Sequence, residues 1–271
     1  LVCPLLQNGF RCGLLVIGGG PAGMEASRVT ALRGHKVTLW EAKDRLGGAL
    51  IPASLAPYKD EIPNVTAYLT TQLGKLRVKV ELNKEATPEA ILEKGADETI
   101  LAVGGLPVIP EMPGVERENV VLAADVLTGN KRVGEKVAII GGGMVGCDTA
   151  EYLTSIGKKV TMIEMLPAIA MDVGVTNRRA LRRRVLAAGV EALTSAKAKA
   201  ITDSGVTVEE AGQTRTIGAD SVVLAAGFRP NTFLWEALKD KVPRLHLIGD
   251  SLEPKHIREA VHEGWTVGCK I

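Results

Sequence analysis

"LLVIGGGPAGMEAS", at residues 14–27, is an apolar run that breaks into glycines and resumes as a run of small residues. A near copy, "VAIIGGGMVGCDTA", follows at residues 137–150. A short continuous apolar run that ends in glycine is typical of a buried strand. The residues after the glycines carry apolar positions at helical spacing. Each copy therefore predicts a strand, a tight turn and a helix.

The two copies also match in the segment after the helix. "HKVTLWE" is a second β-branched run that ends at Glu41, and "KKVTMIE" ends in the same way at Glu164. Gly18 precedes Glu41 by 23 positions, and Gly141 precedes Glu164 by the same 23 positions. The chain therefore contains two strand–helix–strand units of one design. The predicted fold class is α/β, with two Rossmann-like dinucleotide-binding domains, the second inserted in the first.

The glycines and carboxylates of such a unit have separate physical roles. The first glycine makes the tight turn, the second lets the backbone approach a pyrophosphate, and the third allows close packing of the helix on the strand. The N-terminus of the helix attracts the phosphates with free N–H groups and a positive dipole end. The carboxylate after the second strand accepts hydrogen bonds from ribose hydroxyls. These places hold Gly18, Gly20, Gly23 and Glu41 in the first unit, and Gly141, Gly143, Gly146 and Glu164 in the second.

Features beside the first unit suit a long flavin nucleotide. The stretch "AKDRLGGAL" supplies a second glycine pair, Gly47 and Gly48, whereas nothing comparable is recognised in "MLPAIAMDVG" after the second unit. "RLHLIGD" is predicted to be a strand that ends in Gly249 and Asp250, and the carboxylate suits a ribityl chain. A helix that begins at Pro254 would point its positive end at a flavin ring. The first unit is therefore predicted to hold FAD and the second an exchangeable nicotinamide nucleotide.

With these residues in place, the chain resembles a known family. "GGGPAG", "ILAVGG", "VVLAAGFRPN" and "IGD" are similar to the flavoproteins with two dinucleotide-binding domains, over residues from about 12 to 271. "RGHKVTLWEAKDRLGG" and "GDSLEPKHIREAVHEG" look most like the C-terminal half of the NADH:flavin oxidoreductases, which include 2,4-dienoyl-CoA reductase, 2-enoate reductase and trimethylamine dehydrogenase. In that group, this half follows an FMN-binding (β/α)8 barrel with an iron–sulfur cluster. The chain is therefore expected to be the back half alone.

The motifs and the resemblance together imply two sets of cofactor-binding residues. The FAD set is Gly18, Gly20, Pro21, Ala22, Gly23, Glu41, Arg45, Gly47, Gly48, Ala102, Val103, Gly104, Gly249, Asp250 and Ile257. The NAD set is Gly141, Gly143, Met144, Val145, Gly146, Glu164 and Gly227. No residue is assigned as catalytic, because hydride transfer from NADH to a flavin needs stacked rings rather than an acid or a base. The expected FAD-binding domain is 12–125 plus 236–271, and the expected NAD-binding domain is 126–235.

The expected cofactors are FAD and NADH, with NADPH disfavoured. Glu164 accepts a hydrogen bond from a 2′-hydroxyl but repels a 2′-phosphate. The following residues, "MLPAIAM", carry no positive charge, and Arg178 and Arg179 lie further along the chain. The arginine-rich run that contains them, "NRRALRRRVLAAGV", is interpreted as a solvated helix. Alternatively, this run is a docking face for the barrel, or it helps to bind a 2′-phosphate.

The resemblance implies an FAD-dependent oxidoreductase module that accepts a hydride from NADH. The module would pass electrons to an iron–sulfur and FMN barrel, where an unsaturated substrate is reduced. Two alternatives remain open. One is a stand-alone NADH-dependent flavin reductase or diaphorase. The other is a structural module without turnover, like the half of trimethylamine dehydrogenase that holds ADP.

The cysteines argue against a disulfide reductase. "GGALIPASLA" has no cysteine, and Cys147 stands alone inside the second predicted helix, where a packing role is expected. Cys3 and Cys12 cannot by themselves hold a four-iron cluster, which needs four thiolates, so no metal is assigned.

Composition gives no reason to expect nucleic acid or a membrane as a partner. The formal net charge is +2, and no apolar run approaches the roughly 20 residues that span a bilayer. Because the cysteines are scattered and the first residues lack the pattern of a secretory signal, a cytoplasmic location is expected.

Overall fold

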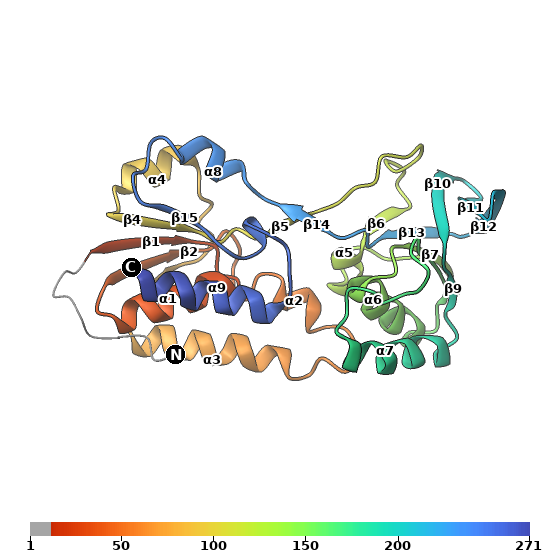
Figure 1. Cartoon of the computed structure of the whole chain (residues 1–271), viewed down its shortest axis with the longest axis horizontal. Coiled ribbons are helices and arrows are strands. Elements are labelled where there is room, and N and C mark those ends of the chain that lie inside the picture. The colour runs from red at the N-terminus through yellow and green to blue at the C-terminus, as the bar shows by residue number, and fades with distance from the viewer. Residues whose placement is uncertain (1–11) are drawn as a thin grey trace. The chain divides into compact units, whose positions relative to one another are not determined.

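The computed structural model describes residues 12–271, which divide into two compact units (Figure 1). The first unit takes in residues up to 51, 61–106 and 228–271, and the second takes in 52–60 and 107–227. Within the described residues, each unit is built around a five-stranded parallel sheet. No helix in this range is long and apolar enough to cross a membrane.

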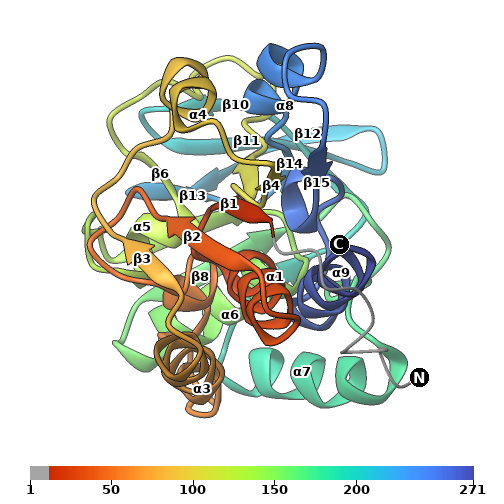
Figure 2. The ribbon, with the colours of Figure 1, turned by 90° about the vertical axis from the view of Figure 1, so that its left-hand side faces the viewer.

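The sheet of the first unit has the strand order β15–β4–β1–β2–β3. Helices α1, α3 and α9 cover one face of this sheet, and α4 and α8 cover the other (Figure 2). The elements are β1 (Gly13–Ile17), α1 (Pro21–Leu32), β2 (Lys36–Trp40), α2 (Leu50–Ala53), α3 (Ile62–Lys75), β3 (Lys79–Glu81), α4 (Pro88–Lys94), β4 (Glu98–Leu101), β5 (Gly105–Pro107), β14 (Phe228–Pro230), α8 (Phe233–Leu238), β15 (Leu245–Leu247), the 3-10 helix η1 (Gly249–Ser251) and α9 (Ile257–Lys270).

The sheet of the second unit has the order β6–β13–β7–β8–β9. Helices α5, α6 and α7 pack on one face, and an antiparallel sheet of β10, β11 and β12 packs on the other. The elements are β6 (Val120–Leu122), α5 (Ala123–Leu127), β7 (Lys136–Ile140), α6 (Met144–Ser155), β8 (Lys159–Ile163), α7 (Val175–Ala187), β9 (Glu191–Leu193), β10 (Ala196–Thr202), β11 (Gly205–Glu210), β12 (Gln213–Gly218) and β13 (Ser221–Leu224).

The continuous apolar runs of the sequence are explained by this layering. In β1, Leu14 and Val16 pack under α1 and α9, while Leu15 and Ile17 face the layer of α4 and α8. Side chains alternate between the two faces of a strand, so a strand covered on both faces is apolar throughout. Strand β7 is buried in the same way between the helices and the antiparallel sheet.

The predicted α/β fold with two Rossmann-like units, the second inserted in the first, is confirmed. Strands β4, β1, β2 and β3 of the first sheet have the same order as β13, β7, β8 and β9 of the second. The fifth strand comes from different places in the chain. In the first unit it is β15, which follows the whole second unit, and in the second unit it is β6, which precedes β7.

The limits of the compact units differ from the domain boundaries expected from the sequence, which were 125/126 and 235/236. The second unit begins at Pro107 because β6 pairs with β13 in its sheet, and Ala123 and Val126 of α5 lie in its core. The first unit resumes at Phe228 because Leu234 and Leu238 of α8 pack in its core. Elements of three to six residues carry too little pattern to mark such boundaries. Which domain binds which cofactor stays a prediction.

Helices α1 and α9 pack closely because small residues face one another (Figures 1 and 2). A Cβ atom at Gly264 would lie 2.4 Å from the carbonyl oxygen of Ala22. A Cβ atom at Gly268, one turn later, would lie 2.7 Å from Cβ of Val29. Side chains four residues apart share one helix face, so these glycines let the two backbones approach.

We expect Gly264→Ala to lower the free energy of unfolding by about 1–3 kcal/mol, because the added methyl group must push a backbone away. Gly74→Ala in α3 is the matched control. Apart from its chain neighbours and the backbone of its own helix, no atom of the described residues lies within 4 Å of the added Cβ, so the change should raise the free energy of unfolding by about 0.5–1 kcal/mol. Urea unfolding followed by circular dichroism measures both. A Gly264→Ala protein as stable as the parent would contradict the close packing.

Candidate dinucleotide-binding sites

The first glycine turn brings backbone atoms very close together. The N–H of Gly18 donates to the carbonyl of Trp40 at 2.8 Å, and Gly18 has a φ of +104°. A Cβ atom at Gly18 would lie 2.2 Å from the carbonyl oxygen of Ala102, and one at Gly23 would lie 1.9 Å from the carbonyl oxygen of Gly18. Neither position has room for a side chain, so both glycines are required by the turn.

The second turn repeats these contacts. A Cβ atom at Gly141 would lie 2.3 Å from the carbonyl oxygen of Ala225, and one at Gly146 would lie 2.0 Å from the carbonyl oxygen of Gly141. The interval from Gly141 to Ala225 is 84 positions, the same as the interval from Gly18 to Ala102. The repeat therefore extends to β4 and β13, the strands that end just before Ala102 and Ala225, and this extension was not detected from the sequence.

Each predicted ribose-binding carboxylate is buried and fixed by backbone N–H groups. Glu41 is 8% exposed and Glu164 is 7% exposed. In both units, the donors are the middle glycine of the turn and the residue two positions after the carboxylate. They are Gly19 and Lys43 for Glu41, at 2.7 and 2.8 Å, and Gly142 and Leu166 for Glu164, at 2.6 and 2.7 Å. Because a carboxylate oxygen accepts more than one hydrogen bond, both side chains retain capacity for ribose hydroxyls.

The loops after the two carboxylates also correspond. The N–H of Gly47 donates to the carbonyl of Gly19 at 2.8 Å, and the N–H of Ala170 donates to the carbonyl of Gly142 at 2.6 Å. Both donors stand six residues after the carboxylate, and both have positive φ, +126° at Gly47 and +55° at Ala170. The correspondence was not recognised from the sequence because an alanine adopts there the conformation that usually indicates glycine.

Segments far apart in the sequence meet at the expected flavin end of the first unit. The N–H of Gly104 donates to Oγ of Ser251 at 2.9 Å, which ties the loop after β4 to η1. Asp250 lies in this 3-10 helix, and its Oδ1 accepts from the N–H of Lys255 at 3.2 Å. Burial raises the pKa of the Asp250 carboxyl above its ordinary value. The predicted flavin residues 102–104 and 249–250 are thus brought together.

The helix predicted to begin at Pro254 begins later. Its first residue is Ile257, with His256 at the N-cap. The N–H of Lys255, ahead of the helix, donates to the Asp250 carboxylate. Ile257, which was assigned to the flavin site, is therefore the first residue of α9.

The other predicted residues lie at helix starts, in turns and, in one case, on the surface. Pro21, Ala22, Met144 and Val145 begin helices α1 and α6. Gly227 has a φ of +93° and accepts from the N–H of Val108 at 2.9 Å. Gly20 and Gly48 lie against each other. Val103 follows β4, and Gly143 is the N-cap of α6. The side chain of Arg45 is 69% exposed and pairs with Asp44.

Two carboxylates beside the second turn were missed by the sequence analysis. The N–H of Met144 donates to Oδ1 and Oδ2 of Asp172, at 3.0 and 2.9 Å. Asp148 on α6 is buried, and its Oδ2 lies 3.1 Å from Nζ of Lys59. Its Oδ1 has no hydrogen-bond partner among the described residues, and burial raises the pKa of its carboxyl. Neither residue stands at a motif position, so no sequence signal pointed to it.

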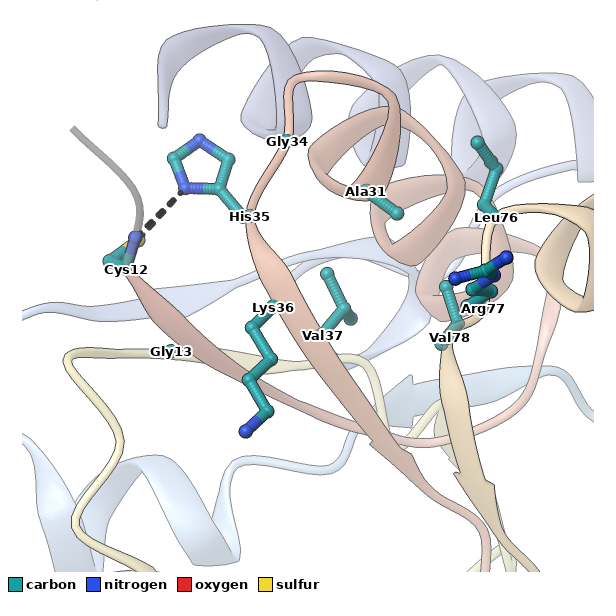
Figure 3. A pocket seen from close by; sticks show the side chains of 10 residues that line it. All are labelled: Cys12, Gly13, Ala31, Gly34, His35, Lys36, Val37, Leu76, Arg77 and Val78. Atoms are coloured by element: carbon teal, nitrogen blue, oxygen red, sulfur yellow. Dashed lines mark hydrogen bonds between the residues drawn. The ribbon is translucent and has the colours of Figure 1, made fainter. Parts of the chain in front are cut away.

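The described thiols are buried and protonated. Cys147 packs in the core of the second unit, and burial raises its pKa to about 12. Cys12 lines a pocket of about 510 Å³ at the start of β1 and β2, at the opposite end of these strands from the glycine turn (Figure 3). Its Sγ lies 3.1 Å from Nδ1 of His35; burial raises the pKa of the thiol and lowers that of the imidazole. Both groups are therefore neutral at neutral pH.

No metal site is found in the described part of the chain. Among residues 12–271, no group of three or more His, Cys, Asp or Glu side chains is arranged to hold an ion. Cys3, which was considered with Cys12 as a cluster ligand, lies outside the described residues.

Comparison with known proteins extends over nearly all of the chain. The cinnamate reductase of Clostridium sporogenes is 38% identical over 261 residues, which is 95% of this chain and 39% of the relative. The NADH oxidase of Thermoanaerobacter brockii is 39% identical over 264 residues, 95% of this chain and 41% of the relative. A solved structure of 2-naphthoyl-CoA reductase with 2-naphthoyl-CoA matches with a TM-score of 0.95 at 34% identity, over 99% of this chain and 41% of that one.

The chain thus spans about two fifths of the length of these relatives. Their match confirms the resemblance to the NADH:flavin oxidoreductases that the sequence predicted. The model of the pyridine nucleotide-disulphide oxidoreductases, a family that binds FAD and NAD(P)H, matches residues 13–264. With both glycine turns and both buried carboxylates inside that range, the chain belongs to the pyridine nucleotide-disulphide oxidoreductase family.

Proposed function

We propose that this chain is the FAD- and NADH-binding module of a larger reductase. It accepts a hydride from NADH onto FAD and passes electrons onward to an iron–sulfur and FMN barrel, where an unsaturated substrate is reduced. The observation that carries the proposal is the same turn built twice, each with a glycine that no side chain can replace and a buried carboxylate fixed by backbone N–H groups.

The first unit fits FAD. The turn from Gly18 to Gly23 would take the pyrophosphate, and Glu41 would take the ribose of the adenosine. Gly20 and Gly48 form a cradle that a side chain would fill, since a Cβ atom at Gly48 would lie 2.9 Å from Cα of Gly20. Asp250 would hold the ribityl chain. When bound, FAD supplies the acceptor of the hydride, and the protein's part is to bind and orient it.

The second unit fits NADH better than NADPH. Glu164 is buried and faces the turn, so a 2′-phosphate would bring a second negative charge into a dry site. Two arginines of α7, the helix that follows Glu164, already donate hydrogen bonds to backbone carbonyls. Nε of Arg178 donates to the carbonyl of Val173 at 2.9 Å, and Nε of Arg182 donates to the carbonyl of Ile169 at 2.7 Å. These bonds support the loop and leave Arg178 less free to meet a phosphate.

The onward partner is inferred from the relatives. They are more than twice as long as this chain, and two of them are named as reductases of cinnamate and of 2-naphthoyl-CoA.

We propose that electrons leave FAD without a dithiol relay. The protonated, buried Cys147 and the lack of cysteine in residues 42–60 support this proposal.

We expect the purified protein to carry FAD rather than FMN, because Glu41 and the pyrophosphate turn are both used only by a dinucleotide. Release by heat followed by chromatography identifies the nucleotide. FMN alone would contradict the proposal. ADP alone would instead favour the structural module without turnover, because Asp250 would then have no ligand group to hold.

We expect Asp250→Ala to weaken FAD binding by about tenfold to a hundredfold, the equivalent of about 1.5–3 kcal/mol for one hydrogen bond to a charged group. Affinity for NAD⁺ should not change. Asp240→Ala, which removes an exposed carboxylate after α8, is the control. Equilibrium titration of the flavin-free proteins measures both constants. Equal FAD affinity in Asp250→Ala and the parent would remove Asp250 from the site.

We expect NADH to reduce the flavin with a kcat/KM at least about tenfold higher than that of NADPH, if one interaction of about 1.4 kcal/mol separates them. Glu164→Gln and Glu164→Ala should narrow this ratio, whereas Glu191→Gln on the adjacent strand β9 should leave it unchanged. Anaerobic stopped-flow reduction with each nucleotide measures the ratio. Equal rates in the unmodified protein would show that Glu164 does not select the nucleotide.

A further inference from the structure

The two glycine turns differ at the first residue of the following helix. Helix α1 begins with Pro21, which has no N–H to donate, whereas α6 begins with Met144. The Met144 N–H donates to both carboxylate oxygens of Asp172, at 3.0 and 2.9 Å. A Cβ atom at Gly143 would lie 2.8 Å from Oδ2 of Asp172, so the carboxylate lies directly over the turn.

This position is where a dinucleotide turn offers its N–H groups to a pyrophosphate. The first turn of a helix carries partial positive charge, which either a carboxylate or a phosphate can satisfy. The two anions would compete for the Met144 N–H and repel each other at that distance. Asp172 therefore lies where the proposed function would place the phosphate of the nucleotide.

The first unit has no such side chain at the corresponding position. The two loops match residue for residue as far as Gly47 and Ala170, which make the same backbone hydrogen bond. Two residues further, the first loop has the uncharged Ala49 and the second has Asp172. The start of α1 is thus left open to a cofactor, while the start of α6 is neutralised by an acidic side chain.

The second loop is built so that this side chain can move while its backbone stays in place. Arg178 donates to the carbonyl oxygens of Met171 and Val173, on either side of Asp172. Arg182 holds the carbonyl of Ile169. The Asp172 side chain itself is exposed, so it can turn into solvent without leaving a buried charge.

We propose that Asp172 is a displaceable internal anion at the nicotinamide-nucleotide site. It caps α6 in the nucleotide-free protein and gives way when the pyrophosphate binds. The free energy needed to displace it lowers the affinity for the nucleotide and favours its exchange after each turnover. The inference rests on the proposed function, since it requires that the second unit binds a nicotinamide nucleotide.

The test is calorimetric titration of the FAD-loaded protein with NAD⁺ and with ADP-ribose, which carry the pyrophosphate and donate no hydride. We expect Asp172→Asn and Asp172→Ala to bind both probes about threefold to tenfold more tightly than the parent. The amide of Asp172→Asn can still accept from Met144, so this variant keeps the loop contact without the charge. Asp203→Asn is the control, because it removes an exposed carboxylate of the same unit that pairs with Arg117.

Salt separates competition from a structural role. Between about 20 and 500 mM KCl, screening weakens repulsion between exposed charges, so the advantage of both variants over the parent should shrink. Equal or weaker binding by the two variants would show that Asp172 anchors the loop and would overturn the inference. If the parent binds neither probe while it retains FAD, the nicotinamide site of the proposed function fails, and the inference fails with it.

Discussion

The contact on which both units depend is the approach of a helix to the carbonyl oxygen of the glycine that ends the preceding strand. Gly23 and Gly146 lie so close to that oxygen that a Cβ atom would be about 2 Å from it. A helix that begins this near the strand has its first N–H groups at the carboxyl edge of the sheet, where a phosphate can reach them. One larger residue at either glycine would move the helix and remove the site.

Repeats in the sequence predicted the parts of the structure that depend on strong local patterns. Long apolar strands, glycine turns and the equal spacing to Glu41 and Glu164 were sufficient to predict the fold, whereas the binding roles of these residues stay predictions. The loops were harder because backbone geometry there does not require one residue type. Ala170 adopts the positive φ that Gly47 has in the first unit, and α9 begins at Ile257 rather than at Pro254. Asp172 and Lys59 act through contacts that only the folded chain creates.

Both candidate sites offer backbone N–H groups and carboxylate oxygens rather than cationic side chains. In each, the groups that face the expected phosphate are N–H groups of a helix start, and the groups that face the ribose are carboxylate oxygens held by N–H donors. This agrees with a net charge of only +2, because neither dinucleotide requires a basic surface. The two sites are distinguished by the loop that returns over the turn, which has the uncharged Ala49 in the first unit and the carboxylate of Asp172 at the corresponding position in the second.

The origin of the fifth strand has a consequence for biosynthesis. The second unit is almost continuous, from 107 to 227 with 52–60 added, whereas the first needs β15 and η1, which follow all of it. A ribosome therefore releases every strand of the second sheet before the last strand of the first. Since domains generally fold as their residues emerge, the second unit can fold while the first still lacks an edge strand and Asp250. Under the proposed function, flavin can then be incorporated only late in the maturation of the protein.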